Sequence, residues 1–335
     1  MKVLLHGWQK NHFIYDGFVD VIGKENVTSF LPQTFHKNYG DEADTYDSSS
    51  LSPDDYDLIV FTPRSFYDKN FKTFLDAGNT NIFMDLEDDF FLRNVYKNPK
   101  ISHYFKREIY TMLPISAPKW YARYFYGSQI LPPIHRRIGI PEYLIPSLPY
   151  RIATLKDDKL RMLSLSVRNS DIPIDYATKS LRRDIALFFC LTPSTIRERR
   201  VYYQKIRTWA RDQKINSFVK SGGVPKKTYV KNLLSSRVAV SLRGMGQDTD
   251  RYWEIAAHGA ALFSPYLPLT IENDFIDKQS AVFFNNFTEF KELFMKYVLH
   301  SDEWFEIARK GRINFLQYHT PKERVKQMLR AVEMK

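Results

Sequence analysis

The sequence predicts an α/β protein with two domains, each built on a parallel sheet, and three observations support this class. Short apolar strands alternate with helical segments along most of the chain. A stretch with five prolines between residues 131 and 150 separates two such sets. The length of 335 residues is sufficient for two domains of ordinary size.

The first set of elements has four expected strands and a helical pattern at 65–77. Proline, aspartate and glycine bound the strands, which cover residues 2–6, 27–31, 57–62 and 81–85. Strands that alternate with helices favour a parallel sheet with crossover connections. We therefore predict an N-terminal Rossmann-like domain over residues 1–130 and an interdomain connection over 131–158.

The second set follows the prolines. Its expected strands are 160–167, 184–191, 217–220, 238–242, 260–264 and 281–284, and its expected helices are 194–212, 226–236, 249–258 and 288–300. The tail over 302–333 reads as helical, with a break at Thr320-Pro321. We predict a C-terminal Rossmann-like domain over residues 159–319 and a last helix, 320–335, that returns toward the first domain.

Composition limits the class of partner. The net charge is +11, which favours anionic partners such as nucleotides, nucleic acid or an anionic lipid surface. The single cysteine, Cys190, excludes an internal disulfide. No run approaches the ~20 apolar residues that span a bilayer, and His6-Gly7 ends the first apolar run too early for a signal peptide. We expect a cytoplasmic protein, with peripheral contact at the inner membrane face as a further option.

The most informative segment runs from Arg237 to Pro265 and reads as strand, turn, helix and strand. Gly244 and Gly246 permit a tight turn and the close approach of a ligand to the backbone. Asp248 or Thr249 can cap the helix that follows. A helix N-terminus behind glycines and an arginine favours a bound phosphate.

Arg251 and Glu254 lie three residues apart on the helix after this turn, so they share a face. One interpretation is an ordinary helical ion pair, worth only a few tenths of a kcal/mol. The glycine turn and the strand on each side favour a second interpretation, a site for a nucleotide sugar. The cation would bind phosphate and the carboxylate would accept hydrogen bonds from sugar hydroxyls.

The segment Arg243-Gly-x-Gly-x-Asp-Thr-x-Arg-x-Trp-Glu254 resembles the donor site of exostosin-like glycosyltransferases and of those grouped with spore-maturation proteins. Tyr104-Phe-Lys-Arg-Glu108 and Gln317-Tyr-His-Thr-Pro-Lys-Glu-Arg324 resemble shorter segments of the second group. The resemblance covers about half of the chain, from residue 183 onward. It implies the GT-B fold, two Rossmann-like domains facing each other across a cleft, and an enzyme that needs no cofactor or metal.

The resemblance also implies residue roles. Arg243 and Arg251, with Gly244, Gly246, Asp248 and Thr249 of the turn, would hold the donor diphosphate, and Glu254 would bind the ribose or the sugar. His319 would contact the hinge. One departure matters: retaining GT-B enzymes often carry a Glu-x7-Glu pair, and Gly246 stands where the first glutamate belongs. Retention or inversion therefore stays open.

Two other loops are candidates for donor binding. In the loop from Thr192 to Arg200, Thr195 can cap the next helix and Arg199 follows on its first turn. A plain basic surface helix is an equal alternative. Ser221 and Gly222 follow an expected strand and would pass beneath the donor's base.

Candidates for the catalytic base lie in the first domain. Asp85 and Glu87 belong to an acidic cluster at the end of an expected strand. That cluster fits a solvated helix cap first, a base that deprotonates the acceptor second, and a metal site third. His6 ends the first strand, and a neutral imidazole near pH 7 can act as a base.

Sugar transfer from a nucleotide-diphosphate donor to a hydroxyl is the first functional hypothesis, with a glycan, a lipid-linked sugar or a modified DNA base as acceptor. A metal-dependent transferase of the GT-A type and a non-catalytic nucleic-acid-binding protein are alternatives. A nicotinamide oxidoreductase is disfavoured, because Gly244-x-Gly246-x-x-Thr249 lacks the third glycine of the dinucleotide fingerprint.

Overall fold

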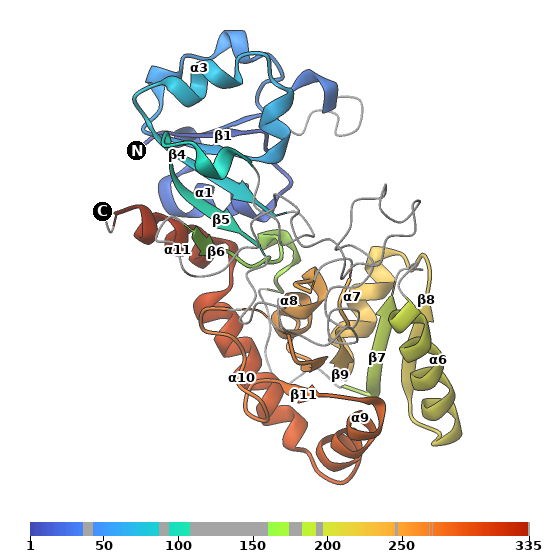
Figure 1. The fold of residues 1–335 in the computed structure, drawn as a ribbon. Coiled ribbons are helices and arrows are strands. Elements are labelled where there is room, and N and C mark those ends of the chain that lie inside the picture. The colour runs from blue at the N-terminus through green and yellow to red at the C-terminus, as the bar shows by residue number, and fades with distance from the viewer. Residues whose placement is uncertain are drawn as a thin grey trace, which may run out of the picture.

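The computed structural model describes residues 1–35, 43–86, 94–107, 160–173, 183–191, 197–244, 247–267, 269 and 271–333. Within these ranges the chain forms two parallel sheets with helices between the strands, which confirms the predicted fold class (Figure 1). The proposed connection over 131–158 and the candidates Glu87, Thr195 and Gly246 lie outside the described residues.

The first sheet has six strands in the order β2-β1-β3-β4-β5-β6. The strands are β1 (Val3–His6), β2 (Val27–Phe30), β3 (Leu58–Phe61), β4 (Thr80–Asp85), β5 (Ile101–Lys106) and β6 (Leu160–Met162). Helices α1 (Phe13–Ile22) and α3 (Phe71–Asp76) connect neighbouring strands. The apolar runs of β1 and β3 are fully buried, as expected for central strands covered on both faces.

Two features of this sheet differ from the sequence prediction. β5 was not expected, and β6 pairs with β5 in the first sheet, whereas residues 160–167 were assigned to the second domain. The sequence of β5 contains polar residues, so it does not show the apolar run expected of a buried strand. One of them, Lys106, is buried because its ammonium lies 3.2 Å from the buried Asp85 carboxylate. A strand that carries an internal ion pair does not read as an apolar run.

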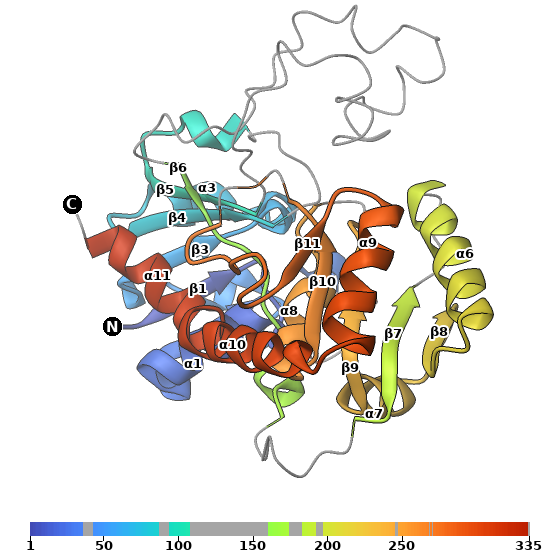
Figure 2. The ribbon, with the colours of Figure 1, turned by 90° about the horizontal axis from the view of Figure 1, so that it is seen from below.

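The second sheet has five strands in the order β11-β10-β9-β7-β8. They are β7 (Ile185–Leu191), β8 (Ser217–Ser221), β9 (Ser236–Val240), β10 (Ala261–Pro265) and β11 (Val282–Phe284). Four helices connect or follow them: α6 (Arg197–Asp212), α7 (Lys226–Leu234), α8 (Asp250–Ala257) and α9 (Phe287–Phe294). α6 and α9 pack on one face of the sheet, and α7 and α8 pack on the other (Figure 2).

The last two helices link the domains. α10 (Glu303–Tyr318) packs against α8, β9 and β10, and α11 (Pro321–Glu333) packs against α1 of the first domain (Figure 1). Val325 and Met328 of α11 are fully buried in a hydrophobic cluster that contains residues of both sheets. Among the described residues, no helix combines the length and the apolar character needed to cross a bilayer.

Gly17 on α1 lies against the start of α11, and a Cβ there would overlap the backbone carbonyl oxygen of Pro321. Alanine is favoured over glycine within a helix by about 1 kcal/mol, but overpacking costs about 1–3 kcal/mol. We therefore expect Gly17→Ala to lower the melting temperature by several degrees in a thermal unfolding experiment. Gly78→Ala is the control, because its Cβ would meet nothing within 4 Å. A Gly17→Ala protein as stable as Gly78→Ala would contradict this packing.

Candidate functional site

The site is built where the strand order of the second sheet reverses. β7 lies between β8 and β9, and the chain leaves it into α6 on one face and leaves β9 into α8 on the other. In open parallel sheets ligands bind beyond the carboxyl ends of the strands at such a reversal. The first turns of α6 and α8 are therefore the positions from which side chains can reach a ligand.

Arg251 and Glu254 on α8 are linked through a third residue, Tyr229 of α7. The Tyr229 hydroxyl donates to Glu254 Oε2 at 2.9 Å, and Arg251 Nε donates to the Tyr229 oxygen at 3.3 Å. The Arg251 guanidinium also lies over the tyrosine ring, 5.9 Å from its centre. The phenol therefore fixes both charged groups, in a geometry unlike that of a solvated helical pair.

Arg199 on the first turn of α6 is the second cation of the site. Its Nε is buried and has no hydrogen-bond partner among the described residues. Burial, and then repulsion by the Arg251 charge, lower the pKa of Arg199 to about 10. Arg199 therefore stays charged at neutral pH, and an anion between the two guanidinium groups would relieve their repulsion.

The environment of Arg251 favours its charged form. Burial alone would lower the pKa of Arg251, but the neighbouring Tyr229 and Glu254 raise it overall. Burial and the Glu254 charge raise the pKa of the Tyr229 phenol, so the hydroxyl keeps its proton and remains a donor to Glu254. The site thus offers two cations and one positioned carboxylate.

Further described candidates for donor binding are Ser221, Gly222, Arg243 and Gly244. Ser221 ends β8 and is exposed, and Gly222 follows it with a φ of 97° and donates its N–H to Leu191 O at the end of β7. Arg243 and Gly244 follow β9 and are half-buried. All four positions lie at or just after the carboxyl ends of strands.

Thr249 and Asp248 do not have the roles that the sequence predicts for them, a helix cap and a ligand contact. Thr249 is the N-cap residue of α8, but its hydroxyl lies 3.2 Å from Ser241 Oγ and makes no capping hydrogen bond. The pair joins the residue after β9 to the N-cap of α8. Asp248 is completely buried, so we correct the prediction that its side chain meets a ligand.

The buried Asp248 carboxylate instead connects segments from distant parts of the chain. Oδ2 accepts from the Leu165 N–H at 2.7 Å, and Oδ1 accepts from Trp253 Nε1 at 2.7 Å. Its backbone carbonyl accepts from the Arg107 guanidinium at 2.9 Å. Arg107 follows β5 of the first sheet, so the glycine turn is attached directly to the N-terminal domain.

His6 is not placed where the sequence prediction expected it. Its ring is fully buried among Phe30, Phe61 and Phe74, and Nε2 lies 3.1 Å from an Asp68 oxygen. Burial lowers the pKa of His6 below that of a free imidazole. A ring with no exposed surface has no access to an acceptor hydroxyl, which corrects the expected cleft-facing position.

Asp85 is also enclosed. It is fully buried at the end of β4, accepts from the Tyr104 hydroxyl at 2.7 Å and pairs with Lys106. Its carboxylate is therefore committed to the interior of the first domain, and the expectation of a solvent-facing base is wrong for this residue. Tyr104 and Lys106, from the segment that resembles the spore-maturation group, both serve this buried cluster.

The C-terminal segment contacts the junction of the domains. His319 Nε2 lies 2.9 Å from the Asn273 carbonyl, and the His319 carbonyl accepts from Ser166 Oγ. The Arg324 guanidinium lies over the Trp253 ring at 4.7 Å and donates to the Leu165 carbonyl. These groups hold α10 and α11 against the segment after β6, so the segment is structural.

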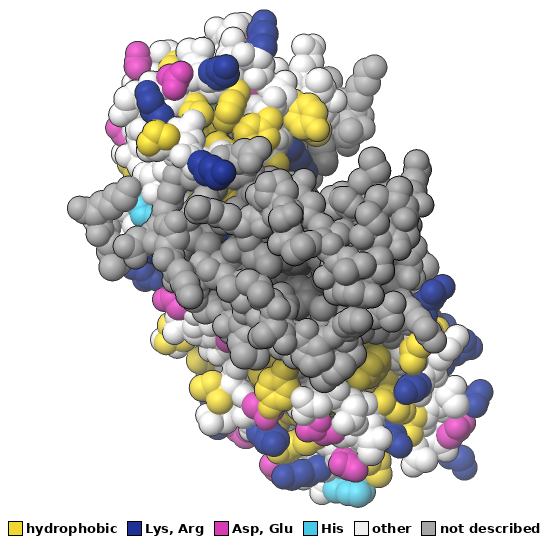
Figure 3. Space-filling model, in the orientation of Figure 1, with side chains coloured by type: hydrophobic (Ala, Val, Ile, Leu, Met, Phe, Trp, Pro, Cys, Tyr) yellow, Lys and Arg dark blue, Asp and Glu magenta, His cyan; other side chains and the backbone are white. Residues whose placement is uncertain are grey.

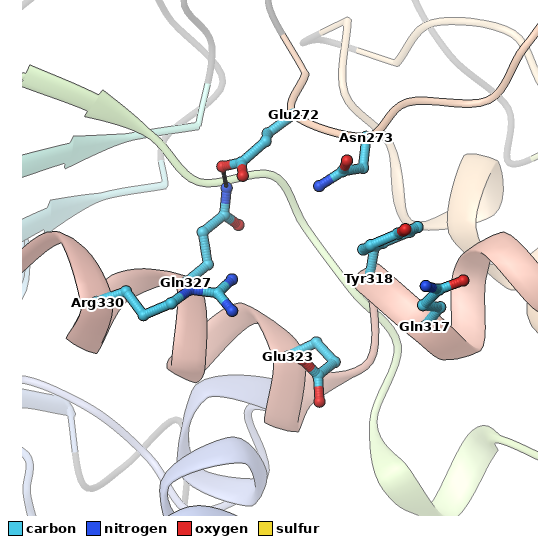
Figure 4. Close-up of a pocket in the computed structure, with 7 residues that line it drawn as sticks. All are labelled: Glu272, Asn273, Gln317, Tyr318, Glu323, Gln327 and Arg330. Carbon is cyan, nitrogen blue, oxygen red and sulfur yellow. Dashed lines mark hydrogen bonds between the residues drawn. The ribbon is translucent and has the colours of Figure 1, made fainter.

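A separate hollow of about 370 Å³ lies between α11, the end of α10 and the loop after β10 (Figure 4). Glu272 accepts from Gln327 at 2.6 Å, and Glu323 and Arg330 also line it. Two carboxylates against one arginine make this hollow unfavourable for a diphosphate. The donor candidates Arg199, Arg251 and Glu254 are not among the residues that line it.

Comparison with known families gives an independent result. Residues 192–330 match the family described as glycosyl transferase-like. The match covers less than half of the chain and runs from the start of α6 into α11, with Arg199, Arg251 and Glu254. No curated protein is similar enough in sequence to match the chain. The exostosin-like subgroup stays a prediction.

Solved structures agree at the level of the fold. An alpha-glucosyltransferase determined with UDP-glucose and DNA containing an abasic site is similar with a TM-score of 0.56 at 8% identity, over 99% of this chain and 98% of that one. A glycosyltransferase from Rickettsia africae gives 0.51 at 9% identity, over 98% and 97%. TarM aligns with 82% of this chain at 11% identity, and the chain spans about half (54%) of TarM's length; the TM-score of 0.45 does not support a common fold.

The chain thus shares the GT-B fold of glycosyltransferases, and residues 192–330 are similar to a glycosyl transferase-like family. The family match covers residues 192–330 alone, so transfer of a sugar by the whole chain is a proposal.

Two contributors were missed by sequence reasoning. Tyr229 lies on α7, where a tyrosine in a helix carries no distinguishing signal, and only the packing of α7 beside α8 shows its role. Arg107 belongs to the quoted segment, but its contact with Asp248 joins residues 141 positions apart. Spacing within one element cannot reveal such contacts.

Proposed function

We propose that Arg199 and Arg251 bind the diphosphate of a nucleoside-diphosphate sugar and that Glu254 accepts hydrogen bonds from a hydroxyl of the ribose or the sugar. The observation that carries this proposal is the buried, unpartnered Nε of Arg199 beside a second cation whose orientation Tyr229 fixes. A diphosphate supplies the negative charge that this pair of guanidinium groups lacks. Arg243, Gly244 and Gly222, at the ends of neighbouring strands, would complete the binding surface.

We infer that the same residues also speed the transfer step. When the bond between the anomeric carbon and the diphosphate breaks, negative charge grows on the leaving phosphate. Preorganised donors aimed at that charge stabilise the transition state, and this is usually the largest catalytic contribution. We propose that the arginines supply this stabilisation without a divalent metal.

The base that deprotonates the acceptor is a separate question. Of the three candidates, His6 and Asp85 are enclosed in the first domain. Glu87, two residues after Asp85, is therefore the remaining candidate for the catalytic base. A glycan, a lipid-linked sugar or a hydroxyl of a DNA base stays open as the acceptor.

UDP and UDP-glucose are the first donors to test, because the similar alpha-glucosyltransferase was determined with UDP-glucose. Bound ligand stabilises the native state by about 2.7 kcal/mol at a hundredfold excess over Kd. We therefore expect UDP, in the presence of EDTA, to raise the melting temperature of the wild type in a thermal-shift panel of nucleoside diphosphates. Arg199→Ala should lose the shift.

Arg207→Ala is the matched control, because Arg207 lies two turns further along α6 and is exposed. It should keep the full shift. If no diphosphate stabilises the wild type, or if Arg199→Ala responds as fully as Arg207→Ala, the assignment of the donor site is overturned. A shift that requires added magnesium would overturn the metal-free part of the proposal.

A further inference from the structure

The positive charge of the chain is concentrated in one segment. Residues 197–231 hold eleven lysines and arginines against two acidic residues, a net charge of +9. The remaining 300 residues hold 38 basic and 36 acidic residues, a net charge of +2. The excess that the composition reveals therefore belongs almost entirely to α6, β8 and the start of α7.

These three elements surround one side of the second sheet. β8 is the edge strand, α6 packs on one face beside it and α7 packs on the other. Figure 3 shows Lys and Arg side chains along the side of the lower domain where α6 lies in Figure 1. We name this surface the basic edge; its exposed cations include Arg200, Arg207, Arg211, Lys214, Lys220 and Lys227.

Neighbouring carboxylates neutralise only some of the cations of the basic edge. Among the side chains described in this region, Arg211 pairs with Asp212 and Lys226 pairs with Asp171. Within the described ranges, Arg207, Lys214 and Lys220 have no carboxylate partner. Their charge is therefore available to an external anion.

The arrangement on α6 distinguishes between kinds of anionic partner. Its apolar residues Ile206 and Ala210 are buried against the sheet, and Val201 is the exposed large apolar residue among its described side chains. The helix therefore offers little apolar surface to insert into a lipid layer. Arg200, Arg207 and Arg211 recur at i, i+7 and i+11 and form a row of about 16 Å. Phosphates of one DNA strand advance by about 3.4 Å along the axis, so this row spans several phosphates.

We propose that the basic edge binds the phosphate backbone of nucleic acid. Arg199 lies on the same helix as the row, one residue before Arg200, so nucleic acid on this surface would run close to the donor site. The surface makes phosphate contacts, which position a polymer without reading its sequence. This inference does not depend on the donor assignment, because it concerns binding in the absence of any nucleotide sugar.

The test is fluorescence anisotropy of a labelled 24-base-pair duplex of about two helical turns, titrated with full-length protein at several salt concentrations between about 50 and 200 mM. We expect wild-type binding that weakens steeply with salt, because each phosphate contact releases counterions. In Arg207→Gln/Arg211→Gln/Lys214→Gln, the slope of log K against log salt should become shallower by about 2.7, at roughly 0.9 per lost contact.

The matched control removes the same amount of charge from the first domain. Lys24, Lys72 and Lys97 are exposed there, and Lys24→Gln/Lys72→Gln/Lys97→Gln should bind as the wild type does. If both triple variants bind the duplex equally weakly, the binding depends on the net charge of the protein and not on the basic edge. That result would overturn the proposal. So would vesicles rich in phosphatidylserine that bind through the basic edge while the duplex does not.

Discussion

Arg251→Ala and Glu254→Ala are each expected to lower kcat by about 10²–10³-fold while the protein stays folded. Removing one preorganised donor to a developing anion, as in Arg251→Ala, typically lowers kcat by about 10²–10³-fold. Misplacing the bound substrate, as expected for Glu254→Ala, lowers it by about 10²-fold. In the proposed site Arg251 would place positive charge beside the leaving diphosphate. Glu254, held by the Tyr229 hydroxyl at 2.9 Å, would orient the donor. Initial rates of sugar transfer with a radiolabelled donor measure the loss, and circular dichroism checks the fold.

The chain contains a matched control for this experiment. Glu306 and Arg309 on α10 form an exposed helical ion pair with the same three-residue spacing, at 2.9 Å. Such a pair contributes only a few tenths of a kcal/mol. Glu306→Ala and Arg309→Ala should leave both rate and stability unchanged. Full activity in Arg251→Ala and Glu254→Ala would show that these two residues have a structural role only, like an ordinary helical ion pair.

Asp248→Ala is expected to destabilise the second domain strongly. The buried carboxylate accepts hydrogen bonds from the Leu165 N–H and the Trp253 indole, and its charge faces the buried Arg324. Truncation leaves these donors without partners in the interior, at a cost of about 3–5 kcal/mol. The melting temperature should fall by on the order of 10 °C.

Asp248→Asn provides the comparison, because it keeps the volume and one carbonyl acceptor. It should be clearly more stable than Asp248→Ala in the same thermal unfolding experiment. The reverse order, or an Asp248→Ala protein that melts with the wild type, would show that the carboxylate does not hold the glycine turn to the segment after β6.

The sequence predicted the fold well wherever strands were apolar and turns were marked by glycine or proline. β1, β3, β7 and β10 are runs of this kind, and the two sheets follow from their alternation with helices. β5 was missed because its buried Lys106 is neutralised by Asp85, which lies on a neighbouring strand. Pairing across strands is a tertiary property that no local pattern contains.

The candidate site was predicted in part for the same reason. Arg251 and Glu254 share a helix, so their spacing alone places them together, and Arg199 follows from a helix start after a strand. His6 and Asp85 were expected at an accessible edge because they end parallel strands. Aromatic rings and a lysine enclose them, and these come from elements distant in the sequence.

The central claim is that a diphosphate binds between Arg199 on α6 and Arg251 on α8. A crystal structure of the protein with UDP tests it most directly. The expected result is phosphate oxygens within hydrogen-bond distance of both guanidinium groups and a nucleoside hydroxyl against Glu254. UDP bound in the hollow lined by Glu272 and Arg330, or anywhere else away from these two arginines, would contradict it.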